Sequence, residues 1–523
     1  MRSLLSRLAL FGSLVFAACT PVAPPASPAV PTEPQRADVQ SIQIAIGAIP
    51  PNLTPQAGFR DLYVWTTMYD TVTEIGRNFE VMPSLAEKWE VSSDGTVWTF
   101  TLRPGGTFSN GDPVTAEDVA FSFNEPIAKA WPIRTFFATV TAARAIDART
   151  VAVTTRSPDM SLPAGAQYVL VIPKAYYESV GGFDGFRDKP MGSGPYIMAE
   201  YVAESRVIFK RRPEPHAFRT PIADELVVRE IPDHGQKING MRTGLVDVIS
   251  PSALSTDQIQ QAETAGMKYQ VIRNAFIFLS VAQGTAELKK SPLTDRRVRV
   301  ALNYAIDKAA ISQTLFRGFA QPLGQLALPG SQSWDPAVQP AYDVARARQL
   351  LTEAGYPNGF RLSVDLSVSQ NLDDLAILVQ SMLKEVNIAL DINVVDAGLY
   401  SDKVYGRNNQ QKGDLVMSGN GDTTGFFTSL RALYGCGRPF GSPATALFYC
   451  NPAWDRALDQ GLAERDDAKR TQLYLEANRI FREDGAMTPL FAPASFMVYT
   501  PKIAGIDVTD RTQFNLDSIY KLK

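Results

Sequence analysis

The sequence predicts an α/β fold in which helices cover a parallel sheet, and three observations support this prediction. Strand-like and helical segments alternate between residues 360 and 418. The residues are 45% hydrophobic and 20% charged, which is typical of a globular protein that buries a core. A length of 523 residues is enough for two or three domains that need neither metal nor disulfide to stabilise them.

The alternating segment begins with a predicted strand at Phe360–Ser367 and continues with strands at Ile388–Val395 and Asp414–Ser418. We expect Asn371 to N-cap the helix between the first two strands. The apolar residues of this helix recur at helical spacing: Leu372, Leu375, Leu378, Val379, Met382, Leu383 and Val386. A short helix near residues 399–408 would lead to the third strand. Such a β-α-β-α-β series predicts a parallel sheet.

Helix and strand signals flank this unit on both sides. Asp343 is expected to cap a helix that ends at Gly355, and a helix over residues 466–484 is expected to end at Gly485. Upstream, β-branched or alternating segments predict strands at Trp98–Arg103, Val151–Thr155 and Glu225–Ile231.

Residues 1–18 have the pattern of a signal peptide. A basic start precedes the apolar run Leu8–Ala18, which is shorter than the roughly 20 residues that cross a membrane. Small residues before Cys19 resemble a bacterial lipobox, in which the cysteine is lipidated. Because Phe16 stands where leucine is usual, cleavage by an ordinary signal peptidase is the alternative. Residues 19–38 are rich in proline and predict an extended tether.

The charge and the rare residues argue against several classes of function. Lys and Arg number 51 and Asp and Glu 54, a balance that does not suit a nucleic-acid groove or a polybasic membrane surface. Three cysteines and two histidines are too few for most zinc modules, iron–sulfur proteins or histidine-rich metal cages. His216 and His234 are interpreted as ordinary loop residues, and no G-x-S-x-G motif occurs. We expect no catalytic site, no protein-bound metal and no cofactor.

The glycine-rich segment Gly419–Gly425 follows the third predicted strand. Ligands of open parallel sheets bind beyond the carboxyl ends of the strands, so this segment lies where a ligand is expected. Gly419 and Gly421 would let the backbone come close to a ligand. Asp422 would accept hydrogen bonds from an amine, and Asn420 is a further candidate. An Asx turn that satisfies Asp422 within its own loop is the competing interpretation.

The most specific motif is Met82–Phe123, which reads P-x-L-A-x-x-W and then D-G-x-x-W-x-F-x-L-R-x-G-x-x-F-x-x-G-x-P-x-T-A-x-D-V. Shorter motifs lie at Gly192–Tyr196 (GSGPY), Asp295–Asp307 (DRRVRVALNYAID) and Ala345–Gly359 (ARARQLLTEAGYPNG). Together they resemble bacterial extracellular solute-binding protein family 5, the dipeptide, oligopeptide and nickel receptors of ABC importers. The resemblance runs from about Ile42 to the C-terminus.

This resemblance implies a two-lobed α/β fold of the periplasmic-binding-protein type (type II, cluster C) with an inserted subdomain. Lobe I would comprise residues 39–283 and 491–523, with the inserted subdomain at about 77–184, and lobe II would comprise residues 284–490. Such a receptor closes on a solute and delivers it to the permease and ATPase subunits of an importer, without catalysis. The resemblance also implies a periplasmic monomer, here anchored to a membrane by lipid, that binds no nucleic acid.

One stretch narrows the resemblance to dipeptide-type receptors, which carry N-G-D-P-x-N-F followed by a pair of cysteines. Asn420, Gly421 and Asp422 match, Phe426 follows them, and Thr423 replaces the proline. In the resembled receptors the aspartate binds the α-amino group of the peptide, and Asp422 would take this role.

The resembled cysteine pair corresponds to Cys436 and Cys450. A disulfide that closes a loop of this size contributes about 3 kcal/mol; two reduced, buried thiols are the alternative. The chain departs from the dipeptide receptors at Ser367–Asn371, which lacks the arginine that holds the ligand carboxylate. The arginines that could replace it are Arg60, Arg134, Arg407 and Arg431.

Three aromatic residues are further candidates for contact with the ligand. The resemblance places the stretch around Trp65 partly at the cleft, and the inserted subdomain that holds Trp131 and Phe136 often reaches the cleft in this family. Packing in a core is the competing interpretation for all three.

The missing arginine also leaves other functions open. The same fold could bind a metal chelate, an opine or an oligosaccharide, and a periplasmic sensor or hydrolase is a third interpretation.

Overall fold

The computed structural model describes residues 36–523 except the segments 56–61, 77–78, 282–290, 397, 401–412, 422–435, 437–450 and 509–513. The predicted signal peptide, Cys19 and most of the predicted tether therefore lie outside the described residues. Over the described part of the chain, none of the helices combines the length and the apolar character that crossing a bilayer requires.

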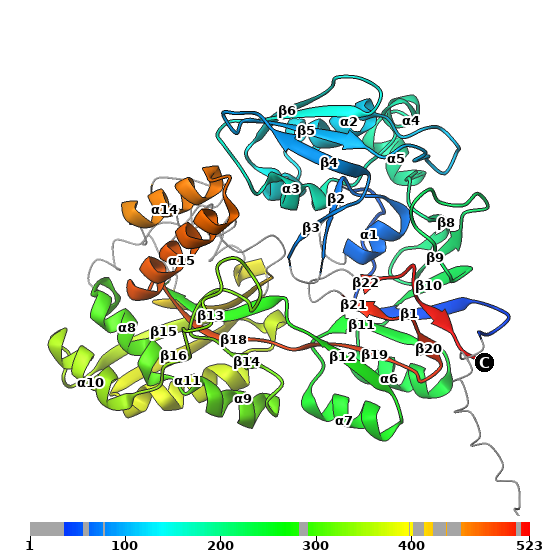
Figure 1. Ribbon diagram of the computed structural model, residues 1–523. Helices are drawn as coiled ribbons and strands as arrows, with labels where there is room; N and C mark the ends of the chain where they lie inside the picture. The colour runs from blue at the N-terminus through cyan, green and yellow to red at the C-terminus, as the bar shows by residue number, and fades with distance from the viewer. Residues whose placement is uncertain are drawn as a thin grey trace, which may run out of the picture. The chain divides into compact units, whose positions relative to one another are not determined.

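Lobe I is built on a seven-stranded mixed sheet (Figure 1). β1 (Ser41–Ile46) lies between β10 (Glu225–Glu230) and β11 (Val248–Ser252) and is parallel to both. The other strands pair antiparallel: β8 (Tyr196–Val202), β9 (Arg206–Arg211), β12 (Lys268–Ile272) and β19 (Ser495–Tyr499). Both faces of the sheet are covered, because the isoleucines of β1 and Ala45 join different buried clusters. The covering helices are α1 (Leu62–Met68), α6 (His234–Thr243) and α7 (Thr256–Thr264).

The inserted subdomain contains an antiparallel sheet in the order β4 (Ala86–Val91), β5 (Val97–Leu102), β7 (Thr150–Thr155) and β6 (Val140–Ala145). Alternate residues of β5 are buried against α2 (Ala116–Ala128). Thr115 and Asp118 form a reciprocal capping box at the start of this helix. The hairpin of β2 (Thr73–Ile75) and β3 (Val81–Pro83) and the short helices α3 (Leu162–Gly165), α4 (Lys174–Ser179) and α5 (Phe183–Asp188) complete this region.

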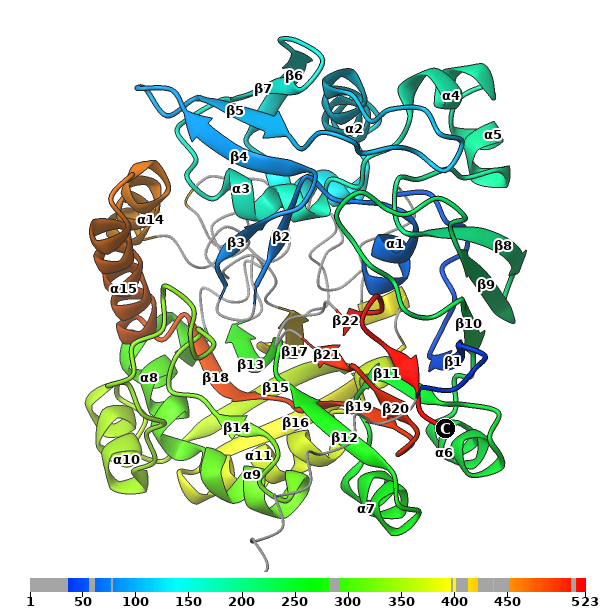
Figure 2. The ribbon, with the colours of Figure 1, turned by 45° about the vertical axis from the view of Figure 1, so that its right-hand side comes forward.

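Lobe II is built on a six-stranded sheet in the order β14 (Gln321–Pro322), β18 (Met487–Ala492), β13 (Ala275–Val281), β17 (Leu415–Gly421), β15 (Phe360–Ser367) and β16 (Ile388–Val395). β15 is parallel to both β16 and β17. A buried apolar cluster joins this sheet to the helices α8 (Arg296–Ala305), α9 (Lys308–Phe316), α10 (Val344–Glu353) and α11 (Asp373–Glu385). A second cluster packs α14 (Pro452–Ala463) and α15 (Asp467–Glu483) against β13 and β18. These two helices run alongside each other (Figure 2).

The chain passes between the two large sheets at two short segments. β12 belongs to the lobe I sheet and β13 to the lobe II sheet, so the first crossing lies at residues 273–274. The second lies at residues 493–494, between β18 and β19. These crossings differ from the predicted boundaries at 283/284 and 490/491, because strand pairing assigns all of β13 and β18 to lobe II.

The parallel unit predicted in lobe II is present. β15 and β16 have the predicted bounds, and Asp343 caps α10 by accepting a hydrogen bond from the Arg346 amide at 2.8 Å. The prediction for Asn371 was wrong: Leu372 is the N-cap residue of α11. Asn371 has a φ of 51° and ends a short 3-10 turn. Most of the helix predicted at 399–408 lies outside the described residues.

Candidate functional site

The carboxyl end of β17 lies at the edge of the parallel unit where a ligand is expected. β13 pairs with β17 along its whole length, from Val281 opposite Leu415 to Ala275 opposite Gly421. β15 pairs with β17 only at Leu415 and Val416. Within the described residues, the carbonyl of Met417 accepts the Tyr400 hydroxyl at 3.3 Å, and no strand pairs with Gly419–Gly421 on the β15 side. Such an edge can accept an extended chain by backbone hydrogen bonding.

The structure changes one part of the predicted ligand segment. Gly419, Asn420 and Gly421 belong to β17 rather than to a loop, because they pair with β13. A Cβ on Gly419 would lie 2.7 Å from Cδ1 of Ile277, so a larger residue would force that side chain to move. Asp422, Phe426 and Cys450 lie outside the described residues. Their predicted roles, and those of Asn420 and Gly421, therefore stay predictions.

The three aromatic candidates pack against protein neighbours. Trp65 is 1% exposed and belongs to the lobe I core, which favours packing as its role. Trp131 is half-buried, and the centroid of its ring lies 6.4 Å from that of Phe183. Phe136 stacks on Tyr168, with ring centroids 3.7 Å apart and planes 12° apart. None of these contacts tests whether Trp131 or Phe136 also touches a ligand.

The arginines proposed to replace the carboxylate-binding residue are mostly outside the described residues. Arg134 is the one that the structure describes, and it is exposed in the 3-10 helix Pro132–Phe137 of the inserted subdomain. Its contact with a ligand carboxylate is untested.

A buried charged cluster in lobe I was not predicted. Nε2 of His216 lies 3.0 Å from Oδ2 of Asp70, and Nη1 of Arg219 lies 3.2 Å from Oδ1 of Asp70. Arg219 also pairs with Asp517 at 2.7 Å. Nδ1 of His216 accepts the backbone amides of Phe218 and Arg219, so its ring proton lies on Nε2 and is donated to Asp70.

The cluster shifts the titration of its own members. Burial by itself would raise the pKa of Asp70, but the hydrogen bonds from His216 and Ser193 and the charge of Arg219 outweigh it and lower that pKa. Burial would lower the pKa of Arg219, but the carboxylates of Asp517 and Asp70 raise it. The sequence held no signal for the cluster, because His216 and Arg219 are more than 140 residues away from Asp70 along the chain.

The strongest sequence motifs hold segments of the protein together. The Trp98 indole donates to the carbonyl of Asp159 at 2.9 Å. The guanidinium of Arg212, the residue directly after β9, donates to the carbonyls of Thr107 and Phe108. These hydrogen bonds connect the end of β9 to the inserted subdomain. These contacts hold residues of the Met82–Phe123 motif in place within lobe I.

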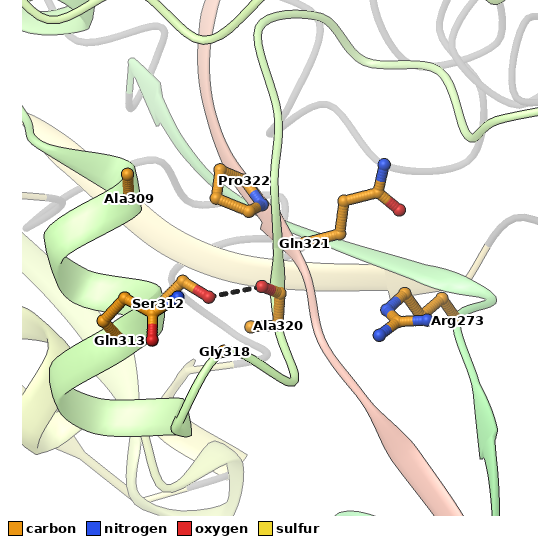
Figure 3. Close-up of a pocket in the computed structure, with 8 residues that line it drawn as sticks. All are labelled: Arg273, Ala309, Ser312, Gln313, Gly318, Ala320, Gln321 and Pro322. Atoms are coloured by element: carbon orange, nitrogen blue, oxygen red, sulfur yellow. Dashed lines mark hydrogen bonds between the residues drawn. The ribbon is translucent and has the colours of Figure 1, made fainter.

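A cavity of about 350 Å³ lies beside the first crossing between the sheets (Figure 3). Arg273, Ser312 and Gln321 line it, and the Ser312 hydroxyl donates to the carbonyl of Ala320. Arg273 donates to the carbonyl of Phe319 at 2.9 Å. The ring of Phe319 in turn packs edge-on against Phe496 of lobe I, with centroids 5.1 Å apart. The cavity thus lies at the join of the lobes.

No metal site is apparent where the structure describes the chain, because no three His, Cys, Asp or Glu side chains gather there in a group that could hold an ion. His234 is the first residue of α6.

Residues 80–440 match the family model described as "Bacterial extracellular solute-binding proteins, family 5 Middle". The chain belongs to this family. The inserted subdomain and most of lobe II fall within the matched region. Members of family 5 bind solutes and are not enzymes, so no reaction is assigned to this protein.

Two curated relatives of this family 5 protein bind different ligands. Heme-binding protein A of Haemophilus influenzae is 24% identical over 497 residues, which cover 87% of this chain and 86% of that protein. Di/tripeptide-binding protein 1 of Pseudomonas aeruginosa is 24% identical over 494 residues, which cover 87% of this chain and 88% of that protein.

Solved structures confirm the two-lobed fold. The periplasmic binding protein DppA from Helicobacter pylori, in complex with the peptide STSA, has a TM-score of 0.73 and 24% identity over 92% of this chain and 98% of that one. The murein tripeptide-binding protein MppA, in an unliganded open form, has a TM-score of 0.75 and 21% identity over 94% of this chain and 99% of that one. At these identities the likeness concerns the fold.

Proposed function

We propose that this protein is the substrate-binding subunit of an ABC importer and that it captures a short peptide, or a peptide-like solute with an amine, between its two lobes. The observation that carries the proposal is the edge of β17, which has no described strand partner on the β15 side where Gly419 and Gly421 lie. An extended peptide offers the alternating amide and carbonyl groups that such an edge binds.

The proposed site joins a backbone edge to one charged residue. Backbone groups around Gly419 and Gly421 would pair with the amides of the ligand. Asp422 directly follows this edge, so its carboxylate would hold the α-amino group of the peptide at the end of the strand. Asn420, Phe426, Trp131 and Phe136 are proposed to contact the rest of the ligand.

Lobe closure would bury the ligand. The lobes are joined by two crossings of about two residues each, 273–274 and 493–494, and a pair of short segments can act as a hinge. The relative MppA was solved in an unliganded open form, which supports an opening motion in this fold. The closed receptor would then present its surface to the permease.

The proposed cellular setting is the periplasm. Lipidation at Cys19 would anchor the chain, and the proline-rich residues 19–38 would act as the tether above the membrane. We also propose a disulfide between Cys436 and Cys450. The amide of Cys436 donates to Asp455 of α14 at 2.9 Å, so this end of the proposed loop is held against lobe II.

A second ligand class is favoured by one observation. Ser367–Asn371 has no arginine to bind a peptide carboxylate, and a bidentate clamp depends on the guanidinium. An oligosaccharide has no peptide carboxylate for that residue to hold, and neither a metal chelate nor an opine presents the C-terminal carboxylate of a peptide. One relative is named as a heme-binding protein, which supports a range of ligands wider than peptides.

Mass spectrometry of the material that purified protein releases on denaturation tests the proposal. We expect masses of short peptides, or of amine-bearing compounds related to them. Recovery of chelates, opines or sugars without peptides would overturn the peptide assignment and support the second class.

A further inference from the structure

The inserted subdomain contacts lobe II at points remote from the two crossings. The amide of Met160 donates to the carbonyl of Leu462 in α14 at 2.7 Å. Nη2 of Arg465 donates to the carbonyl of Val91 at 2.9 Å and also to the carbonyl of Ser92. Two separate segments of the subdomain thus reach one short stretch of lobe II, residues 462–465, which ends α14 and leads to α15.

The subdomain side of this contact is held firmly. Asp159, which precedes Met160, is buried, and its carbonyl accepts the Trp98 indole of β5. The carboxylate of Asp159 accepts the Thr139 hydroxyl at 2.5 Å and the Ser161 amide at 2.9 Å. Val91 is the last residue of β4, so it too is fixed by a strand. The subdomain groups that bond to lobe II are therefore already held in position, and little conformational entropy is lost when the contact forms.

The lobe II side is held equally well. Arg470 of α15 donates to the carbonyl of Glu464 at 3.0 Å, which closes the connection between the two helices. Gly461 lets the helices come close, because a Cβ there would lie 2.6 Å from the Tyr474 ring. Arg465 is consequently presented from a rigid corner between α14 and α15.

A third contact lies at the β2–β3 hairpin. Phe79, between these two strands, is partly buried against the apolar cluster of lobe II that includes Trp454 and Phe481. A Cβ on Gly330 of lobe II would lie 4.0 Å from its ring. Apolar and polar contacts therefore join the lobe I side to lobe II without passing through the crossings.

We propose that residues 91–92, 159–160 and 462–465 form a clasp that holds the lobes together, with Arg465 as its positioning residue. The inference rests on the proposed lobe closure: parting of the lobes about residues 273–274 and 493–494 breaks the bonds of Arg465 and Met160. The clasp contains no residue of the proposed ligand site. It therefore sets how readily the protein closes, whatever solute it binds.

Hydrogen exchange of the full-length chain, with no ligand added, tests the clasp. The Met160 amide donates across the clasp, so its exchange rate reports the broken state directly. We expect this amide to be protected in the unmodified protein. Arg465→Ala should make its exchange about three- to tenfold faster, since two exposed hydrogen bonds to a charged donor are lost.

A matched variant and an internal reference make the result specific. Arg479→Ala removes an exposed arginine within α15, which pairs with Glu476 and Glu483 of the same helix, and it should leave the exchange of the Met160 amide unchanged. The Thr155 amide, which bonds to Thr96 within the subdomain, should keep its exchange rate in both variants. A Met160 amide that exchanges freely in the unmodified protein, or equally fast with and without Arg465, would overturn the clasp. Because no ligand is used, that result would leave the proposed ligand class untouched.

Discussion

Nε2 of His216 lies 3.0 Å from Oδ2 of Asp70, and both side chains are almost fully buried. The pair connects Asp70, two residues after the end of α1, to the segment after β9, and Arg219 extends it to Asp517 near the C-terminus. Three distant parts of lobe I are therefore linked through the Asp70 carboxylate and the Arg219 guanidinium. Loss of the carboxylate leaves the other charged and polar groups buried without their partner.

Asp70→Asn should lower the free energy of unfolding by about 2–3 kcal/mol at pH 7, because hydrogen bonds to a charged group are lost. The pKa of Asp70 is lowered in the folded protein, so the stabilisation is present above its ordinary value near 4 and disappears as the pH falls through the lowered value. Urea denaturation at pH 7 and at pH 3 should show the difference between the two proteins shrinking at acid pH.

Asp184→Asn serves as the control for this variant, because Asp184 pairs with Arg187 at an exposed position. We expect a change of less than about 1 kcal/mol. If Asp70→Asn unfolded at the same urea concentration as Asp184→Asn, the buried cluster would have no role in stability.

Gly194→Ala should destabilise the protein by about 1–3 kcal/mol. A Cβ at this position would lie 2.6 Å from the carbonyl carbon of Met68, and the Gly194 amide donates to the Met68 oxygen at 2.8 Å. The backbone would have to move, because no flexible side chain is available to yield. Gly47→Ala is the control, since a Cβ there meets nothing within 4 Å. Equal urea midpoints for both variants would contradict the close approach.

Lys308→Met should flatten the pH dependence of stability between about pH 7 and pH 10. Burial lowers the pKa of Lys308 to about 7, against a smaller opposing effect of the Asp307 charge. In this range the unfolded chain keeps a proton that the folded protein has released, so stability rises with pH by at most about 1.4 kcal/mol per pH unit. Denaturation at three pH values in this range measures the slope.

Lys384→Met is the matched control, because Lys384 is exposed on α11. This variant should keep the slope of the unmodified protein. A slope that Lys308→Met leaves unaltered would mean that Lys308 titrates normally, with its hydrogen bond to Asn303 compensating for burial.

Local patterns in the sequence predicted the elements that local forces decide. Phe360–Ser367 and Ile388–Val395 have the predicted bounds, because alternate or continuous apolar residues specify a buried strand. Asn371 misled the prediction of a helix start. Its side chain suits an N-cap, but the residue tolerates a positive φ and ends the preceding turn instead.

The features that the sequence pattern did not predict depend on contacts between residues far apart in the chain. Gly419 to Gly421 look like a loop by composition, yet β13, more than 130 residues earlier, draws them into a strand. The same strand moves the first crossing between the lobes to residues 273–274. His216 resembled an ordinary loop histidine, because its partner Asp70 lies 146 residues earlier and no local pattern indicates the pairing.

The proposed role of Asp422 gives the ligand site its sharpest test. Removing the charge of the ligand amine should have the same effect as removing the carboxylate, since each deletes one half of the same ion pair. The comparison uses a dipeptide that binds the full-length protein, its N-acetylated form, and the variant Asp422→Asn.

Isothermal titration calorimetry of the dipeptide and its N-acetylated form is the most direct test of the central claim. We predict that acetylation weakens binding to the unmodified protein at least tenfold, about 1.4 kcal/mol, and that Asp422→Asn removes most of this discrimination. Equal affinity for the two peptides, or binding of neither by a protein that releases a chelate, opine or sugar, would contradict the claim that this chain recognises the amine of a short peptide.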